Sequence, residues 1–248
     1  MIPALRSRWT PDPRWALKVT VPPAIEPVSV EQVKAMLGIT TDTRDATIAM
    51  QITIARTLAE EFTARAFITQ TIQYQVDRFP PGRIPWWDGT IQAPLRAFIS
   101  QEPLLLPRPP LVTLTSVQYY DESNTLRTID SSSYYVDSIT EPARVVLNPG
   151  VSWPTDVRDR AAVLVTYNAG YGATSASVPM GIQQAIIAHV SDYLDRPNAN
   201  VQTERIDNAS VTYGNVSNNQ GATMSFNGGL RGDAIALLSP YRIIDTGL

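Results

Sequence analysis

The chain has 248 residues, of which 44% are hydrophobic and 17% are charged, and its net charge is −3. A chain of this length can bury about 70% of its unfolded surface, enough for one large domain or two small ones. It has no cysteine and a single histidine, His189. Disulfides and thiolate metal sites are therefore excluded, and no histidine-based metal site or other cofactor is expected.

The charge content lies below the roughly 25% that is usual for soluble domains, and twenty residues are prolines. This composition fits either a protein whose surface is largely covered by partners or a β-rich domain with neutral loops. A net charge of −3 does not indicate a nucleic-acid-binding surface over the whole chain. The sequence has no recognisable signal peptide and no apolar run of about 18 residues, so we expect a cytoplasmic protein without a membrane span.

Residues 1–27 are rich in proline and are interpreted as an extended N-terminal arm. Basic and aromatic residues alternate along it: Arg6, Arg8, Trp9 and Trp15. We predict that these four residues contact a partner or nucleic acid, and the open alternative is a strap that lies over the chain's own domain.

Residues 28–67 form the first part of a predicted helical bundle. Ser29 and Gln32 have the spacing of a capping box, and Gly38 is placed to end this short helix. A longer helix is predicted from Asp42 or Thr43. Its apolar stripe consists of Ile48, Ile52, Ala55, Ala59, Phe62 and Ala66; Ile54 and Leu58 widen it, and Glu60 and Glu61 are expected to face away.

Residues 68–172 are interpreted as an inserted antiparallel β-domain, because short runs of alternating apolar residues are separated by turns. The first strand contains Ile72, Tyr74 and Val76. In LPRPPLVTLTSVQYYD (106–121), the prolines are expected to stop pairing upstream, so that a strand begins near Leu111 with a bulge near Thr115–Ser116. Later strands are predicted at 125–129, 134–137, 144–147 and 162–167.

The second part of the bundle is predicted at residues 178–196, where the apolar stripe of one helix includes His189 and Tyr193. Residues 197–231 form a polar insertion in which 210–214 and 222–226 alternate like the strands of a hairpin. Residues 232–248 contain a short helix that Asp233 is expected to cap and Pro240 to end, followed by a tail. The predicted fold class is therefore α+β, a helical bundle with an inserted β-domain, an N-terminal arm and a C-terminal hairpin or arm.

Motifs for catalysis are absent from the sequence. It contains no phosphate loop, no dinucleotide fingerprint and no nucleophile elbow. A catalytic triad would need His189, which its helical stripe explains better as a packed or interface residue. Trp86 and Trp87 next to Asp88 suit either stacking on a sugar ring or covering a sheet edge. We therefore predict that the chain is not an enzyme.

Several segments, in this order, resemble the head–tail connector (adaptor) proteins of long-tailed bacteriophages and gene transfer agents. The resemblance covers roughly residues 22–196 and 233–243. The segments are PPAIEPVSVEQVKAML (22–37), ARTLAEEFTARAFITQTIQYQVDRFP (55–80), LPRPPLVTLTSVQYYD, YYVDSITEPARVVL (134–147), SWP (152–154), VTYNAGYG (165–172), VPMGIQQAIIAHVSDYL (178–194) and LLSPYR (237–242).

This resemblance implies a non-enzymatic virion protein of the neck, assembled in the cytoplasm of the producing cell. It implies a ring, usually of twelve identical subunits, beneath the portal protein at the capsid vertex. Genomic DNA would pass through the ring without sequence-specific binding, and the next neck or tail-completion protein would dock on it. Two segments, residues 1–21 and 197–231, depart from the family pattern, so the resemblance does not indicate their roles.

Two contact sites for the portal or a neighbouring subunit are hypothesised. The first is the polar insertion, where strand addition would use Val211, Tyr213, Met224 and Phe226. The second is the C-terminal pair Tyr241 and Arg242. Two other functions remain open from sequence: a carbohydrate-binding or tail-associated recognition module that uses Trp86 and Trp87, and a hydrolase that uses His189.

Overall fold

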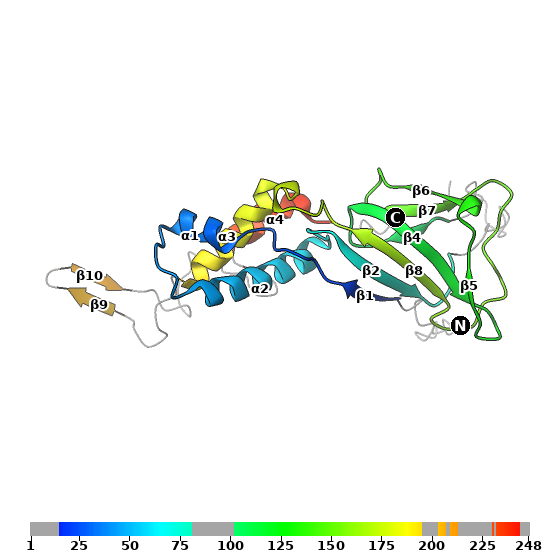
Figure 1. Cartoon of the computed structure of the whole chain (residues 1–248), viewed down its shortest axis with the longest axis horizontal. Coiled ribbons are helices and arrows are strands. Elements are labelled where there is room, and N and C mark those ends of the chain that lie inside the picture. Colours follow the sequence, from blue (N-terminus) through cyan, green and yellow to red (C-terminus); the bar gives the residue numbers. More distant parts are fainter. Residues whose placement is uncertain are drawn as a thin grey trace, which may run out of the picture. The chain divides into compact units, whose positions relative to one another are not determined.

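The computed structural model describes residues 15–80, 102–194, 203–206, 209–212, 230 and 232–243. Helices and antiparallel sheets give the α+β class predicted from the sequence (Figure 1). The chain divides into two compact units. We call Met1–Pro22 with Thr69–Gly170 the sheet unit, and Pro23–Ile68 with Tyr171–Leu248 the helical unit.

The helical unit begins with α1 (Val30–Leu37), whose ends form as the sequence predicts. The Gln32 amide donates to Ser29 Oγ at 3.2 Å, and the Ser29 amide donates to Gln32 Oε1 at 2.8 Å, which completes the capping box. Gly38 ends the helix with φ of 67°, a left-handed conformation that suits glycine. Val28 and Val33 flank the cap and are both buried in the core.

Helices α2 (Asp45–Thr63) and α3 (Met180–Leu194) supply most of the helical core. The predicted stripe from Ile48 to Ala59 is buried, and full burial of each large aliphatic side chain stabilises the unit by about 1.5–3 kcal/mol. Four expectations about these helices were wrong, and the first is that Ala66 belongs to the helical stripe, since α2 ends at Thr63. Ile54 and Tyr193 are exposed at 40% each, whereas Glu60 is buried at 6% exposure.

Glu60 is buried because both of its carboxylate oxygens are satisfied. The Phe67 amide donates to Oε1 at 2.9 Å, and Arg56 Nη1 donates to Oε2 at 3.0 Å. A carboxylate with such partners escapes the penalty of unpaired burial. Glu60 was expected to face away because helical spacing alone does not reveal the Phe67 amide, which lies beyond the end of the helix.

Helix α4 (Gly232–Leu238) packs against α3. Asp233 lies within the helix as described, rather than at its cap, and Leu238 is buried while Leu237 is exposed. Helix α4 ends at Leu238, two residues before Pro240, as predicted. Ser239–Tyr241 follows as a 3-10 helix, η4, in which the proline occupies a first-turn position.

Apart from Met1–Pro22, the sheet unit is an insertion in the chain between the two segments of the helical unit. The chain leaves the helical unit at Ile68 and returns at Tyr171, whose amide donates to the Phe67 carbonyl at 2.9 Å. Between these points lie β2 (Gln70–Val76), β3 (Leu104–Leu106), β4 (Leu111–Tyr120), β5 (Leu126–Thr128), β6 (Tyr134–Asp137), β7 (Ala143–Leu147) and β8 (Val163–Ala169).

One antiparallel sheet has the order β1-β2-β8-β4-β5. In β8 every second residue is buried, from Val163 to Ala169, so one face of this sheet forms the core. The register between β4 and β8 shifts between Leu114 and Ser116, which confirms the predicted bulge.

The second antiparallel sheet has the order β3-β7-β6. It corrects the expectation that pairing stops upstream of the prolines, since Leu104–Leu106 pairs with Ala143–Leu147 in this sheet. The prolines at 107, 109 and 110 therefore lie on the connection from one sheet to the other. The buried Tyr167 hydroxyl donates to the Pro107 carbonyl at 2.5 Å and ties this connection to the core.

The N-terminal arm expected over residues 1–27 contains a strand that the sequence reading missed. Trp15–Val21 forms β1 and pairs antiparallel with β2. This part of the arm therefore lies on the chain's own domain, which was the alternative left open by the sequence. Within the polar insertion, β9 (Thr203–Ile206) pairs with β10 (Ala209–Thr212). The strand expected at 210–214 thus forms in part, with an upstream partner, while the one expected at 222–226 lies outside the described residues.

Candidate assembly surfaces

Of the residues considered for catalysis, His189 lies in the described part of the chain. No group of three or more His, Asp or Glu side chains there is placed to hold a metal ion. None of the described helices is long and apolar enough to cross a membrane. His189 is 7% exposed and lies on the buried face of α3, as its helical position predicts. Trp86 and Trp87 lie outside the described residues.

A polar clamp joins the segment before α1 to α2. Arg56 Nε donates to Glu26 Oε2 at 2.7 Å, and the same guanidinium donates to Glu60 Oε2 at 3.0 Å. The Arg56 side chain is only 12% exposed. Removing one partner of such a buried pair typically costs about 3–5 kcal/mol, because the other charge is left unpaired. The clamp therefore fixes the path of the chain into α1.

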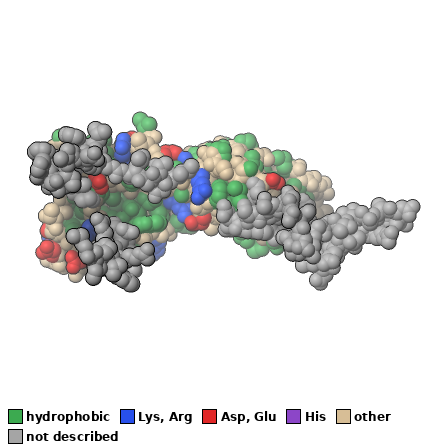
Figure 2. All heavy atoms as spheres, turned by 180° about the vertical axis from the view of Figure 1, so that it is seen from behind, with side chains coloured by type: hydrophobic (Ala, Val, Ile, Leu, Met, Phe, Trp, Pro, Cys, Tyr) green, Lys and Arg blue, Asp and Glu red, His purple; other side chains and the backbone are tan. Residues whose placement is uncertain are grey.

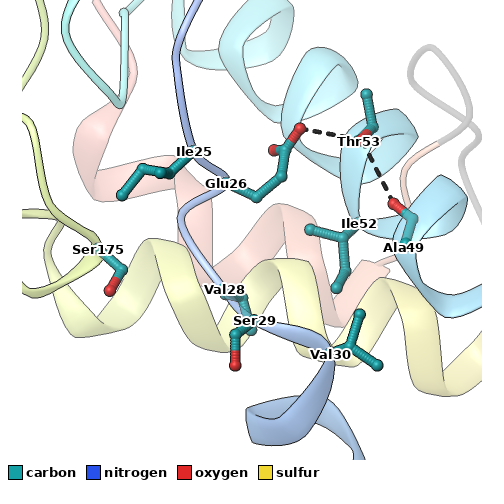
Figure 3. Close-up of a pocket in the computed structure, with 9 residues that line it drawn as sticks. All are labelled: Ile25, Glu26, Val28, Ser29, Val30, Ala49, Ile52, Thr53 and Ser175. Atoms are coloured by element: carbon teal, nitrogen blue, oxygen red, sulfur yellow. Dashed lines mark hydrogen bonds between the residues drawn. The ribbon is translucent and has the colours of Figure 1, made fainter. Parts of the chain in front are cut away.

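Beside this clamp lies an open groove with a volume of about 420 Å³ (Figure 3). Its lining residues are Ile25, Glu26, Val28, Ser29, Val30, Ala49, Ile52, Thr53 and Ser175. The Thr53 hydroxyl lies 2.9 Å from Glu26 Oε1, to which it donates, and 3.3 Å from the Ala49 carbonyl. Glu26 is the one carboxylate among the lining residues and already binds Arg56. The groove thus suits apolar contact better than acid–base catalysis.

Tyr241 and Arg242 differ in their surroundings, since Tyr241 packs against α3 and Arg242 is exposed. A Cβ on Gly181 would lie 2.9 Å from the Tyr241 hydroxyl and 3.1 Å from its ring, so the Tyr241 ring rests on the start of α3. The Tyr241 carbonyl accepts a hydrogen bond from Arg65 Nε at 2.6 Å. Arg242 is exposed, and its guanidinium lies 5.4 Å from the centre of the Phe62 ring. Of the two residues, only Arg242 is free to meet a partner without disturbing the fold.

Strand β1 presents an unusual apolar edge. Trp15 and Val19 pair in register with Val76 and Ile72, and directly opposite residues in an antiparallel pair lie on the same face. Val76 and Ile72 are buried, yet Trp15 is 65% exposed and Val19 44%. Of the predicted arm residues, Trp15 is therefore placed on this edge, while Arg6, Arg8 and Trp9 lie outside the described residues.

The other hypothesised contact residues belong to the polar insertion. Val211 lies in β10, whereas Tyr213, Met224 and Phe226 lie outside the described residues. The structure does not bring Val211 together with Tyr241 and Arg242 in any described contact. Strand β1 is the candidate surface that the sequence reading missed. The alternation of Trp15, Leu17, Val19 and Val21 was the available signal.

Surface charge is mixed in sign and locally paired. Lys34 bonds to Asp42 and Asp45, and these hydrogen bonds raise the pKa of Lys34. In the sheet unit, a hydrogen bond from Arg144 is the main cause that lowers the pKa of Asp137. On the face drawn in Figure 2, basic and acidic side chains lie among hydrophobic ones.

Comparison with protein-family models gives no match, and comparison with curated protein sequences gives none. The solved structures that are similar in fold include three from gene transfer agent particles. One chain from the neck of an empty gene transfer agent (GTA) particle, computed with C6 symmetry, has a TM-score of 0.61 at 17% identity, covering 92% of this chain and 96% of that chain. A chain from the virion of a native GTA particle has a TM-score of 0.56 at 17% identity, with coverages of 92% and 95%.

The third similar structure is a chain from the neck of a native GTA particle computed with C12 symmetry. Its TM-score is 0.52 at 16% identity, and the match covers 92% of this chain and 96% of that chain. Both units of the protein are included in matches of this extent. The chain therefore has the fold of proteins found in GTA particles, which agrees with the resemblance drawn from its sequence.

Proposed function

We propose that the protein is a structural neck component of a phage-like particle, a head–tail adaptor that forms a ring beneath the portal. The observation that supports this most is the similarity of fold to a GTA neck chain over 92% of this chain and 96% of the other. A partial match could reflect one shared domain, whereas this one includes both units in the same chain order.

The ring is supported by symmetry and by surface chemistry. The similar neck structures were computed with C6 and C12 symmetry, and a ring of twelve subunits is compatible with both. Subunits related by rotation in such a ring meet through two unlike surfaces. The protein offers several apolar surfaces of this kind, among them the edge of β1 and the groove beside Glu26.

DNA can pass through the ring only if the surface that lines the lumen binds DNA weakly. A protein that neutralises many phosphates binds DNA tightly at low salt. The net charge of −3 and the pairing of Lys34 with two aspartates favour weak contact instead. In this proposal the adaptor acts by shape: it extends the channel and presents a surface to the next neck or tail-completion protein.

The direct test is to delete the gene in cells that produce the particles. We expect heads and tails that remain separate, and heads that lose their DNA, because the portal would lack its adaptor. Expression of the intact chain from a plasmid should restore joined particles. Joined particles that retain their DNA without the chain would contradict the proposed function.

The polar insertion is proposed as one docking element, for the portal or for a neighbouring subunit, and the deletion of residues 203–228 tests the contact with the portal. We expect this variant to remain folded by circular dichroism but to lose binding to the portal, measured by co-sedimentation. Portal binding equal to that of the intact chain would rule out this role.

The C-terminal turn offers a second docking test with a built-in control. Arg242→Ala should weaken portal binding with little loss of stability, because Arg242 is exposed. Tyr241→Ala should instead lower the unfolding midpoint, since its ring packs on α3 near Gly181. If Arg242→Ala binds the portal as well as the unchanged chain does, the contact lies elsewhere.

A further inference from the structure

We propose that β1 is a docking edge for the β9–β10 hairpin of an adjacent copy, so that a sheet continues from one subunit into the next. This inference rests on the proposed ring and names one of its contacts. It assigns the acceptor surface to the sheet unit of one copy and the donor to the helical unit of another.

The first observation is an open edge. β1 is the terminal strand of the five-stranded sheet and pairs with β2 on one side only. No described strand pairs with its other side. A terminal strand presents a row of N–H and C=O groups that can template pairing with another chain. At seven residues, β1 is long enough to accept either strand of the hairpin.

The second observation is the apolar face of this edge. Trp15 and Val19 lie on the core side of the sheet, opposite the buried Val76 and Ile72, but they remain largely exposed. Figure 1 shows β1 at the side of the sheet away from β6 and β7, so the second sheet does not cover it. A further element laid alongside β1 would bury surface that the isolated chain leaves in water.

The third observation is that β1 has little of the usual protection of an edge strand, which amounts to one lysine and one bulge. Natural edges are kept short or carry prolines and several charges. β1 contains Lys18 as its single charged residue and no proline. The bulge between Val19 and Val21 is the one irregularity in its pairing. An edge with these features is suited to regular use as a binding site.

The donor is itself an incomplete sheet. β9 and β10 form a two-stranded sheet, and no third described strand joins it. An isolated hairpin is marginally stable in water, and further strands are needed to stabilise it. The hairpin and β1 thus each have an open strand edge, and the two edges can pair with each other.

The size of this contact favours a ring over a simple dimer. The strands of the hairpin have four residues each, and pairing one of them with β1 buries far less than the roughly 1,000 Å² expected of an independent interface. A single contact of this kind is weak. In a closed ring every copy donates one hairpin and accepts another, and the two surfaces are unlike, as rotational closure requires.

Cysteine cross-linking tests the contact cleanly, because the chain has no cysteine of its own. Two single-cysteine variants are mixed: Ala16→Cys on β1, and Ser210→Cys on β10. A third, Arg205→Cys on β9, covers pairing through the other strand of the hairpin. With a short bismaleimide, we expect a cross-linked dimer only in mixtures that combine a β1 variant with a hairpin variant, increasing with protein concentration.

A matched pair of lysine variants separates the edge from general surface effects. Val19→Lys, placed in the Ala16→Cys chain, should lower the cross-link yield about tenfold, the factor produced by a loss of about 1.4 kcal/mol. Val112→Lys in the same chain should leave the yield unchanged, because Val112 is similarly exposed at 48% but lies on β4, which β2 and β8 separate from β1.

The outcomes distinguish this contact from the proposed function. Rings observed by native mass spectrometry without the mixed cross-link would overturn the contact and leave the adaptor role in place. A cross-link that forms only within a chain carrying both cysteines would also overturn it, since the hairpin would then complete its own copy's sheet. A chain that stays monomeric at every concentration, with no cross-link, refutes the contact, whereas the adaptor role is judged by the gene deletion.

Discussion

The two edges of the five-stranded sheet are built in opposite ways. β5, at one edge, has three residues and is anchored by Asp121, which accepts hydrogen bonds from the amides of Ser123 and Thr125 and from Arg127, each at 2.9 Å. β1, at the other edge, has seven residues with exposed apolar side chains and a single charge. The β5 edge is finished within the chain, and the β1 edge is not.

This difference separates two uses of a sheet edge. A short strand held by a buried carboxylate and an arginine offers few free backbone groups and little apolar surface to another chain. A long apolar strand offers both. In a protein proposed to form rings, the unfinished edge, opposite the finished one, is where we propose that the neighbouring copy binds.

The largest effect is expected from truncating the buried member of one cross-strand pair, while truncating its exposed partner should have little effect. Ile72→Ala removes a fully buried side chain and should cost about 2–5 kcal/mol. Val19→Ala, directly opposite on the open edge, should cost less than about 0.5 kcal/mol in the monomer. Urea unfolding of both variants at low protein concentration measures the contrast. Equal losses would show that β1 is covered within the chain.

A smaller and pH-dependent effect is expected at the finished edge. The hydrogen bond from the Thr125 amide, with that from Arg127, lowers the pKa of Asp121 from its ordinary value of 3.8. The carboxylate therefore stabilises the fold above pH 3.8, and this contribution is lost as the pH falls through the lowered pKa. Asp121→Asn should reduce the thermal midpoint at pH 7.

The same variant supplies its own control at low pH. Once Asp121 is protonated in the unchanged chain, the two proteins should differ much less, so their midpoints should converge toward pH 2. A difference that stays constant from pH 7 to pH 2 would mean that the ionised carboxylate does not hold this turn.

The smallest effect is expected at a side-chain bond on the open edge. Thr20 Oγ1 donates to the Thr71 carbonyl at 3.2 Å on exposed surface, where water can replace it. Thr20→Ala should therefore change the free energy of unfolding by no more than about 0.5 kcal/mol. A loss above 1 kcal/mol, read from the same urea titrations, would show that β1 is fixed by side chains and leaves no adaptable edge.

Features set by local chemistry could be predicted from the sequence. The capping box of Ser29 and Gln32 and the left-handed Gly38 need only residues close in the chain, and the strands at Tyr134 and Val163 follow from alternation. His189 was correctly assigned to a buried helical face.

Features set by distant partners could not be predicted in this way. Glu60 is buried because the Phe67 amide and Arg56 meet it in the fold. β1 was obscured by the prolines that precede it, although its own residues alternate, and the hairpin of the polar insertion uses a nearer partner than the one expected. The contact proposed for Val211 would depend on a second copy or on another protein, and residue spacing within one chain cannot reveal such a partner.

The central claim is that copies of this protein tile around a channel through unlike surfaces. Electron cryomicroscopy of the neck of particles that contain the chain tests it most directly. We predict a ring beneath the portal in which each β1 is extended by a strand from the adjacent copy. Density that places the chain outside the neck, or as a two-fold dimer joined by identical surfaces, would contradict the claim.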